Sequence, residues 1–239
     1  MTLVGSSTEN PSITQRLAAY GPTALVLSGF FAALGTIFLV LFFALEAPGL
    51  LSSGTETWTP LGRTNDALIG LAALVAIAAA FRLHQSWGTR AAGTSRVALV
   101  IGLVALLGVG IIQLPFAAGF ISSAIAGPLV TVGLGGIGVW LFLVSLGRAD
   151  QALNRTLRWI GIVTGVGYVL LPVAFFAAGG SGATEDPQAL FQSPFLIIAF
   201  TASILSSQIG YPIWAIWLGR RLRADRRQGW SEAGRESTT

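Results

Sequence analysis

The sequence predicts an all-α protein, a polytopic bundle of six transmembrane helices with both termini on the cytoplasmic side. Three observations predict it. Hydrophobic residues make up 53% of the 239 residues and charged residues only 10%, whereas soluble domains carry about 25% charged residues. No charge occurs between Arg96 and Arg148, and at roughly 1.5 Å per residue this stretch would form about 76 Å of helix, enough for two crossings. Finally, the arginines cluster between alternate apolar segments.

The first two helices are predicted from apolar runs of unequal length. The run from about Thr23 to Leu45 is longer than the core of a signal peptide, about 7–15 residues, so we expect a retained helix after a polar, flexible tail at residues 1–18. The second run, from about Ala67 to Phe81, is short for a crossing. It spans if residues 64–66 cap it at the outer interface and the long side chain of Arg82 reaches the other interface.

The third and fourth helices are expected from Arg96 to about Phe120 and from about Pro128 to Gly147. The joint at residues 119–127 is short, which makes these helices antiparallel neighbours. The fifth helix is expected from Trp159 to Ala178. It ends on the letters Phe-Ala-Ala-Gly, as the third does, and a duplicated hairpin or chance in apolar sequence would both produce this match.

The sixth helix is expected to open with Ser193 as cap and Pro194 at its first position, where proline is favoured, and to run to Gly219. The transmembrane domain then covers residues 19–222, and an arginine-rich cytoplasmic tail covers residues 223–239.

Orientation follows from the arginines. With the N-terminus inside, every arginine except Arg63 falls on the cytoplasmic side, as the positive-inside rule requires. We therefore expect a multi-pass protein of the plasma membrane with the lipid bilayer as its surroundings. Anionic lipid is the expected partner of the basic segment after the sixth helix. That segment contains Arg220, Arg221, Arg223, Arg226 and Arg227.

The composition excludes several kinds of chemistry. The chain has no cysteine, no lysine and one histidine, His84, so disulfides, zinc clusters, bis-histidine haem and a retinal Schiff base have no ligands within it. His84 lies beside Arg82 at the predicted cytoplasmic boundary, where an interfacial role is expected. The net charge of +4 is explained by membrane orientation, so no nucleic-acid partner is expected. We predict no catalytic residue, cofactor or metal, and no enzyme activity; an intramembrane enzyme remains the third alternative.

Glycines within the spans indicate close helix packing. Gly161 and Gly165 have the GxxxG spacing, Gly29 and Ala33 share it, and the fourth helix carries four further glycines. Small residues let helix backbones approach in lipid. These faces favour a non-enzymatic protein that acts by packing against a partner or against a second copy of itself.

Polar residues at membrane depth define the candidate site. Tyr168 and Gln208 fall near the midplane with Ser206 and Ser207, and Gln113 lies closer to the outer face. An unpaired polar group in hydrocarbon is costly, so these groups must face one another. Either they form interhelical hydrogen bonds or they line a polar pocket, with Trp58 in the outer loop as headgroup anchor or lid. The candidate pocket comprises Glu46, Trp58, Asn65, Asp66, Gln113, Tyr168 and Gln208.

Two short runs carry a resemblance. Pro60-Leu61-Gly62-Arg63-Thr64-Asn65-Asp66 and the ending Tyr211-Pro212-Ile213-Trp214-Ala215-Ile216-Trp217-Leu218-Gly219-Arg220 resemble a family of uncharacterised bacterial and archaeal six-helix membrane proteins, a domain of unknown function. The resemblance implies the architecture and no site residues. The alternative to helix packing is a small-molecule or lipid-binding permease component with a pocket open to the outer face, like the six-helix substrate-binding subunits of vitamin importers.

Overall fold

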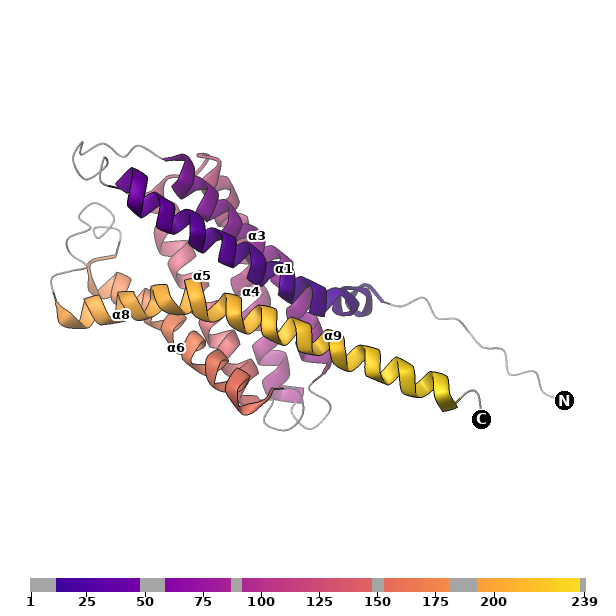
Figure 1. The fold of residues 1–239 in the computed structure, drawn as a ribbon. Helices are drawn as coiled ribbons and strands as arrows, with labels where there is room; N and C mark the ends of the chain where they lie inside the picture. Colours follow the sequence, from indigo (N-terminus) through magenta and orange to yellow (C-terminus); the bar gives the residue numbers. More distant parts are fainter. Residues whose placement is uncertain (1–11, 48–58, 87–91, 148–152, 181–192, 237–239) are drawn as a thin grey trace.

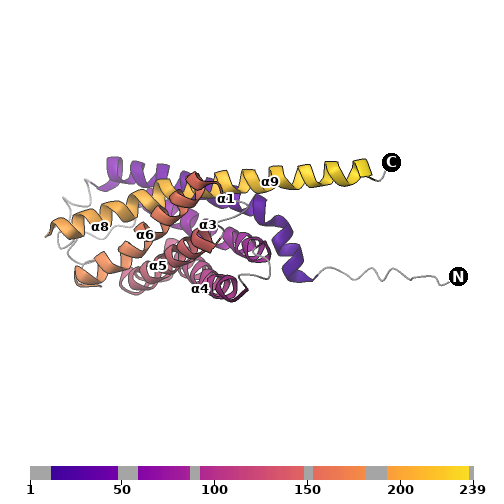
Figure 2. The same cartoon turned by 90° about the horizontal axis from the view of Figure 1, so that it is seen from below.

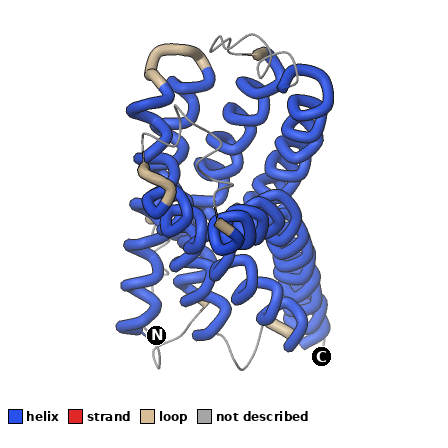
Figure 3. The backbone as a smooth tube through the Cα atoms, turned by 90° about the vertical axis from the view of Figure 1, so that its left-hand side faces the viewer, coloured by secondary structure: helices blue, strands red, loops and turns tan. Residues whose placement is uncertain are grey.

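The computed structural model describes residues 12–47, 59–86, 92–147, 153–180 and 193–236 (Figure 1). Helices take up 92% of these residues, and no strand occurs among them. Figure 3 shows the described elements as a bundle of helices. The all-α fold class is confirmed.

Six helices are long and apolar enough to cross a membrane. They are α1 (Ile13–Leu41) with its π-helical continuation η1 (Phe42–Glu46), α3 (Pro60–Gln85), α4 (Ala92–Ala117), α5 (Ser123–Gly147), α6 (Arg155–Ala177), and a last span built from α8 (Pro194–Leu205), η4 (Ser206–Gly210) and α9 (Tyr211–Glu236). Even α6, with 23 residues, measures about 35 Å against a hydrocarbon core of about 30 Å.

Consecutive spans are neighbours, and the last span closes the bundle. Helix α1 packs on α3, α3 on α4, α4 on α5 and α5 on α6. In the last span, α9 packs on α1 and α8 packs on α6. The start of α1 and the end of α9 lie at the same end of the bundle (Figure 1), and α9 runs on past the other helices (Figures 1 and 2). We call this end, which carries Arg16, Arg96 and Arg155, the arginine-rich end, and the other the opposite end. The membrane side that each end faces stays a prediction.

Several helix ends differ from the predicted ones. Helix α1 begins at Ile13, because Ser12 and Gln15 form a capping box, so residues 13–18 belong to the helix and the predicted tail is wrong there. Helix α9 likewise continues to Glu236 through most of the predicted C-terminal tail. Hydropathy marks where the chain enters lipid, whereas a polar turn such as 14–16 is compatible with helix.

The predicted cap of the second span is also wrong. Helix α3 begins at Pro60, seven residues before the expected start, since proline is preorganised for the first helical position. Residues 64–66 therefore lie in its second turn. Thr64 Oγ1 donates back to the carbonyl of Pro60 at 2.8 Å, and Asn65 is buried. The additional turns at both ends make α3 a full span of 26 residues.

The repeated Phe-Ala-Ala-Gly letters mark two similar helix ends. Gly119 has φ of 82° and Gly179 has φ of 106°, the left-handed region that favours glycine. In each case the following residue closes the turn, with Phe120 N donating to Pro115 O and Gly180 N donating to Phe175 O, both at 2.9 Å. This is the Schellman pattern. A shared way of ending α4 and α6 accounts for the repeated letters without a duplication.

Glycines hold the helices close together inside the chain. A Cβ at Gly138 of α5 would lie 2.6 Å from the carbonyl of Gly165 on α6, and one at Gly29 of α1 would lie 3.0 Å from the carbonyl of Pro212 on α9. Such distances leave no room for a side chain. The prediction that these glycines serve helix packing is confirmed, and their partners are neighbouring helices of the same chain.

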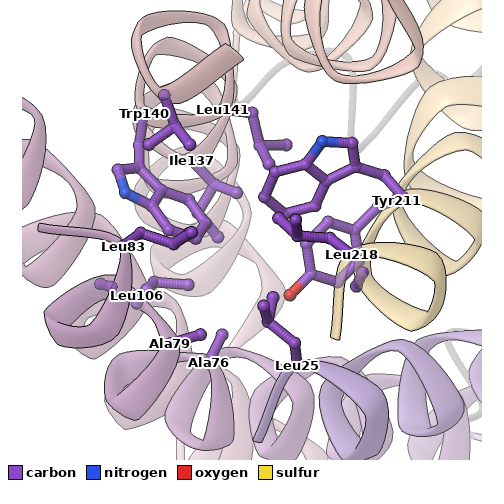
Figure 4. Packing of buried hydrophobic residues seen from close by; sticks show 14 of the residues in the cluster. Leu25, Ala76, Ala79, Leu83, Leu106, Ile137, Trp140, Leu141, Tyr211 and Leu218 are labelled. Carbon is purple, nitrogen blue, oxygen red and sulfur yellow. The ribbon is translucent and has the colours of Figure 1, made fainter. Parts of the chain in front are cut away.

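Burial is arranged as expected for a protein in lipid. Large apolar side chains are exposed on all six spans, for example Phe30, Val104 and Val163, where lipid tails would cover them. The core contains the small alanines of α3, and in Figure 4 Ala76 and Ala79 point into the same space as Leu25 and Tyr211. Among the spans, α3 exposes only Leu71 of its large apolar residues, so it is the most interior helix.

Candidate functional site

A cavity of about 60 Å³ lies inside the bundle. Every span contributes to its wall, which makes it the point where all six helices meet. The residues lining it are Ala32 of α1; Ile69, Ala72 and Ala73 of α3; Leu106 and Val109 of α4; Leu134 and Ile137 of α5; Tyr168 of α6; Ser207 and Gln208 of η4; and Tyr211 of α9. None of these described lining residues is charged, so the wall offers hydroxyl and amide groups on an apolar background.

Two polar residues of the wall, Ser207 and Gln208, come from an irregular turn of the last span. At Ser206–Gly210 the helix widens, and Tyr211 N donates to Ser206 O across five residues. This π-helical segment inserts an extra residue, a feature that is frequent at functional sites. Helix α6 accommodates it with Gly167, where a Cβ would collide with Ser206 Oγ, and Ser203 Oγ donates to the Gly167 carbonyl at 2.8 Å.

Hydrogen bonds tie α1 to the cavity wall. Ser28 Oγ donates to the Ala72 carbonyl at 2.8 Å and lies 2.6 Å from Tyr211 Oη. Two turns further along α1, Thr36 Oγ1 lies 2.7 Å from the Gln208 carbonyl and 3.0 Å from Gln208 Oε1. Two of the three cavity-lining residues of η4 and α9, Gln208 and Tyr211, are thereby fixed from the same helix.

Aromatic rings continue the wall toward the core. Tyr168 and Tyr211 meet edge to face with ring centroids 6.3 Å apart, Tyr211 stacks on Trp214 at 6.4 Å, and Trp140 meets Trp214 at 6.2 Å. Such pairs prefer these offset or edge arrangements. The rings give the cavity one rigid side, since each ring is held by the next.

A second group of polar residues lies toward the opposite end, and we call Glu46, Asn65, Asp66 and Gln113 the polar cluster. Gln113 Nε2 donates to Asp66 Oδ1 at 2.7 Å, joining α4 to α3. Glu46 Oε1 accepts from Leu61 N at 3.3 Å, which places a carboxylate at the start of α3, the favourable end of the helix dipole. Glu46 Oε2, Asn65 Oδ1 and Gln113 Oε1 are buried without a partner among the described residues.

The predicted pocket is therefore divided in two. Tyr168 and Gln208 line the central cavity, whereas Glu46, Asn65, Asp66 and Gln113 form the polar cluster and do not line it. Consecutive residues of α1 connect the two groups, because Gly35 lies against Asn65 and Thr36 against Gln208. Trp58, with the proposed lid, lies outside the described residues. Asp66 makes its contact inside the bundle, with Gln113, and does not cap its helix.

Sequence reasoning missed Ser28, Thr36 and Tyr211. Ser28 and Thr36 are eight residues apart, a spacing that puts them on the same side of a helix, and this was the available signal on α1. Tyr211 begins the regular helix after η4. Like the hydroxyl of Tyr168, its hydroxyl is a polar group at membrane depth that needs a hydrogen-bond partner.

Comparisons with protein-family models, with curated proteins and with solved structures find no match to this chain. The resemblance carried by residues 60–66 and 211–220 therefore stays a prediction, and the site is interpreted from its own geometry.

The one histidine of the chain lies apart from the central cavity. At the arginine-rich end, His84 Nδ1 lies 2.5 Å from Ser95 Oγ and links α3 to α4, away from the central cavity. In the part of the chain that the structure describes, no group of three His, Asp or Glu residues is placed to hold a metal ion. The cavity presents hydroxyls, an amide and aromatic rings, groups that can form hydrogen bonds and apolar contacts.

Proposed function

We propose that the protein is a membrane permease component whose central cavity holds a small, uncharged molecule that forms hydrogen bonds. The observation that carries this proposal is that all six spans, together with the π-helical segment at Ser206–Gly210, build the wall of one cavity. Ligand sites between helices of a bundle are mostly apolar with a few placed polar groups, and this wall has that composition.

The size of the cavity restricts the solute. One water needs about 10–15 Å³ of such volume, so a cavity of about 60 Å³ has room for roughly four waters, or for one solute of a few heavy atoms. Because no charged residue lines the described wall, an ion entering it would lose its hydration without a compensating charge. A neutral solute is therefore favoured.

The polar cluster supports a route from the opposite end. Ile69 lines the cavity, and Asn65 and Asp66 lie about one turn before it on α3. Their buried oxygens, with those of Glu46 and Gln113, provide acceptors between that end and the cavity. We propose that a solute enters from this side and passes the cluster before it reaches Gln208.

The glycine faces support this proposal over packing against a partner. Gly29, Gly138, Gly161 and Gly165 contact helices of the same chain, so they offer no free surface for another protein. Gly108 on α4 has open space beside it in the part of the chain that the structure describes. Association with a partner or a second copy stays a prediction that would need such a lipid-facing surface.

The test is solute flux in proteoliposomes that contain the full chain. Stopped-flow light scattering would measure the permeability to water, urea and glycerol, and protein-free liposomes set the background. Ala73→Leu adds three carbons to the cavity wall, whereas Ala177→Leu adds the same carbons at an exposed position of α6. We expect wild type and Ala177→Leu to pass at least one probe several-fold faster than protein-free liposomes do. The permeability with Ala73→Leu should fall toward that background.

A second variant covers the chance that Ala73→Leu does not fold. Gln208→Leu keeps the volume but removes the amide, and we expect it to slow urea more than water, since urea needs the lost hydrogen bonds. Background flux for all three probes with folded wild-type protein would overturn the proposal, as would equal flux in wild type, Ala73→Leu and Gln208→Leu.

A further inference from the structure

A groove of about 410 Å³ lies between the end of α5 and the start of α6, at the arginine-rich end. Its volume is several times that of the central cavity and falls within the range of about 300–1,000 Å³ typical of sites for small organic molecules. The described residues that line it are Leu146, Leu153, Arg155, Arg158, Trp159 and Ile162.

The described lining of the groove carries positive charge without a matching negative one. Arg155 is exposed and Arg158 is half-buried, and no carboxylate occurs among the described lining residues. The sequence from residue 148 to residue 158 contains three arginines and one aspartate, so its net charge is positive in any arrangement. Arginine forms bidentate hydrogen bonds with phosphate oxygens, and two of them at one groove suit a phosphate group.

Polarity changes along the groove in the order that a phospholipid requires. Arg155 lies in the first turn of α6, Trp159 one turn later and Ile162 about 10 Å beyond the first arginine, at roughly 1.5 Å per residue. Trp159 is 56% exposed and Leu146 is 40% exposed. Tryptophan at the headgroup level is typical of a membrane interface, and the partly buried Ile162, almost one turn further into the span, adds an aliphatic side chain to the groove.

From these observations we infer that the groove is a binding site for an anionic phospholipid, with the phosphate on Arg155 and Arg158 and the upper acyl chains against Trp159, Leu146 and Ile162. A soluble phosphate compound would use the arginines alone and leave the apolar half of the groove empty. The site differs from the basic segment of α9, because it combines charge with a shaped apolar surface. It is also independent of the central cavity.

The test is native mass spectrometry of the full chain released from mixed nanodiscs. Equal amounts of phosphatidylglycerol and phosphatidylcholine with identical acyl chains are the probes. Arg155→Ala/Arg158→Ala removes both groove charges. Arg16→Ala/Arg96→Ala removes two exposed arginines from the same end but outside the groove, and serves as the matched control.

We expect wild type to retain phosphatidylglycerol in preference to phosphatidylcholine. The groove double variant should lose about tenfold in retention for each arginine, because it removes charge-assisted hydrogen bonds to the phosphate, and the control less than twofold. Ile162→Trp, which fills the groove with both arginines intact, should also lose retention, and an excess of glycerol 3-phosphate should not displace the lipid. Equal losses in the two double variants, equal retention of both lipids, or displacement by glycerol 3-phosphate would each overturn the inference.

Discussion

Two serines show how differently two regions of this bundle treat a buried polar group. Ser28 on α1 and Ser145 on α5 are both fully buried, each with an exposed fraction of 0%. Beside the central cavity, Ser28 has two hydrogen-bond partners, the Ala72 carbonyl and Tyr211 Oη. At the contact of α5, α6 and α9, the Ser145 hydroxyl has no partner among the described residues, and neither does the nearby indole nitrogen of Trp214.

The difference distinguishes buried polar residues that form a hydrogen-bond network from buried polar residues that serve only packing. Ser28 joins α1, α3 and α9 around a space, and Thr36 joins α1 to Gln208 in the same way. Ser145 lies against Gly161, where its small side chain lets α5 and α6 pack closely. A buried polar residue therefore does not mark a site by itself; a network of such residues around a cavity does.

The largest expected effect comes from filling the contact beside Ser145. In Gly161→Ala, the new methyl group would collide with Ser145 Oγ and lie 2.6 Å from Trp214 Nε1. Overpacking of this kind costs about 1–3 kcal/mol, and we expect a loss of about 2 kcal/mol in the free energy of unfolding. The measurement is unfolding of the detergent-solubilised protein by increasing amounts of SDS, followed by circular dichroism.

The control for this variant is Gly108→Ala. No atom of the described residues lies within 4 Å of a Cβ at Gly108, and alanine is the better helix former by about 1 kcal/mol, so this change should be neutral or slightly stabilising. If both variants unfold alike, the α5, α6 and α9 contact is not closely packed and the comparison fails.

Ser28→Ala is expected to have the next largest effect. It removes two hydrogen bonds at the cavity wall, each worth about 0.6 kcal/mol on average in membrane proteins, and leaves the Tyr211 hydroxyl buried without its partner. We expect a loss of about 1 kcal/mol in the free energy of unfolding, measured in the same SDS titration.

A double-mutant cycle sharpens this prediction. Tyr211→Phe removes the other hydroxyl, and the double variant should cost less than the sum of the single changes, because contacting residues are coupled. Additive losses would mean that the two hydroxyls do not interact, and the network around the cavity would then have no energetic basis.

The sequence was sufficient to predict the number of spans, because a transmembrane helix depends on the average hydropathy of about 20 residues and not on any single one. Hydropathy and the arginine clusters predicted six crossings, and the same arithmetic placed Tyr168 and Gln208 at cavity depth. The helix starts at Ile13 and Pro60 depend on local capping and proline geometry, which hydropathy does not report. Polar pairing was less accessible, since Ser28 and Tyr211 are 183 residues apart in sequence. No local pattern identifies such a pair, and the π-helical turn beside it leaves no mark in composition.

The smallest expected effect, and the one of opposite sign, is that of Ser145→Ala. The substitution removes a hydroxyl for which the described residues provide no partner and leaves a methyl group of similar size against Gly161. Removing an unsatisfied buried group is neutral or stabilising, so the free energy of unfolding should stay within about 0.5 kcal/mol of wild type or rise. The same SDS titration, run beside Ser28→Ala, measures the contrast directly. A loss as large as that of Ser28→Ala would show that Ser145 is hydrogen-bonded in the membrane, and that the two regions hold their polar groups by the same means.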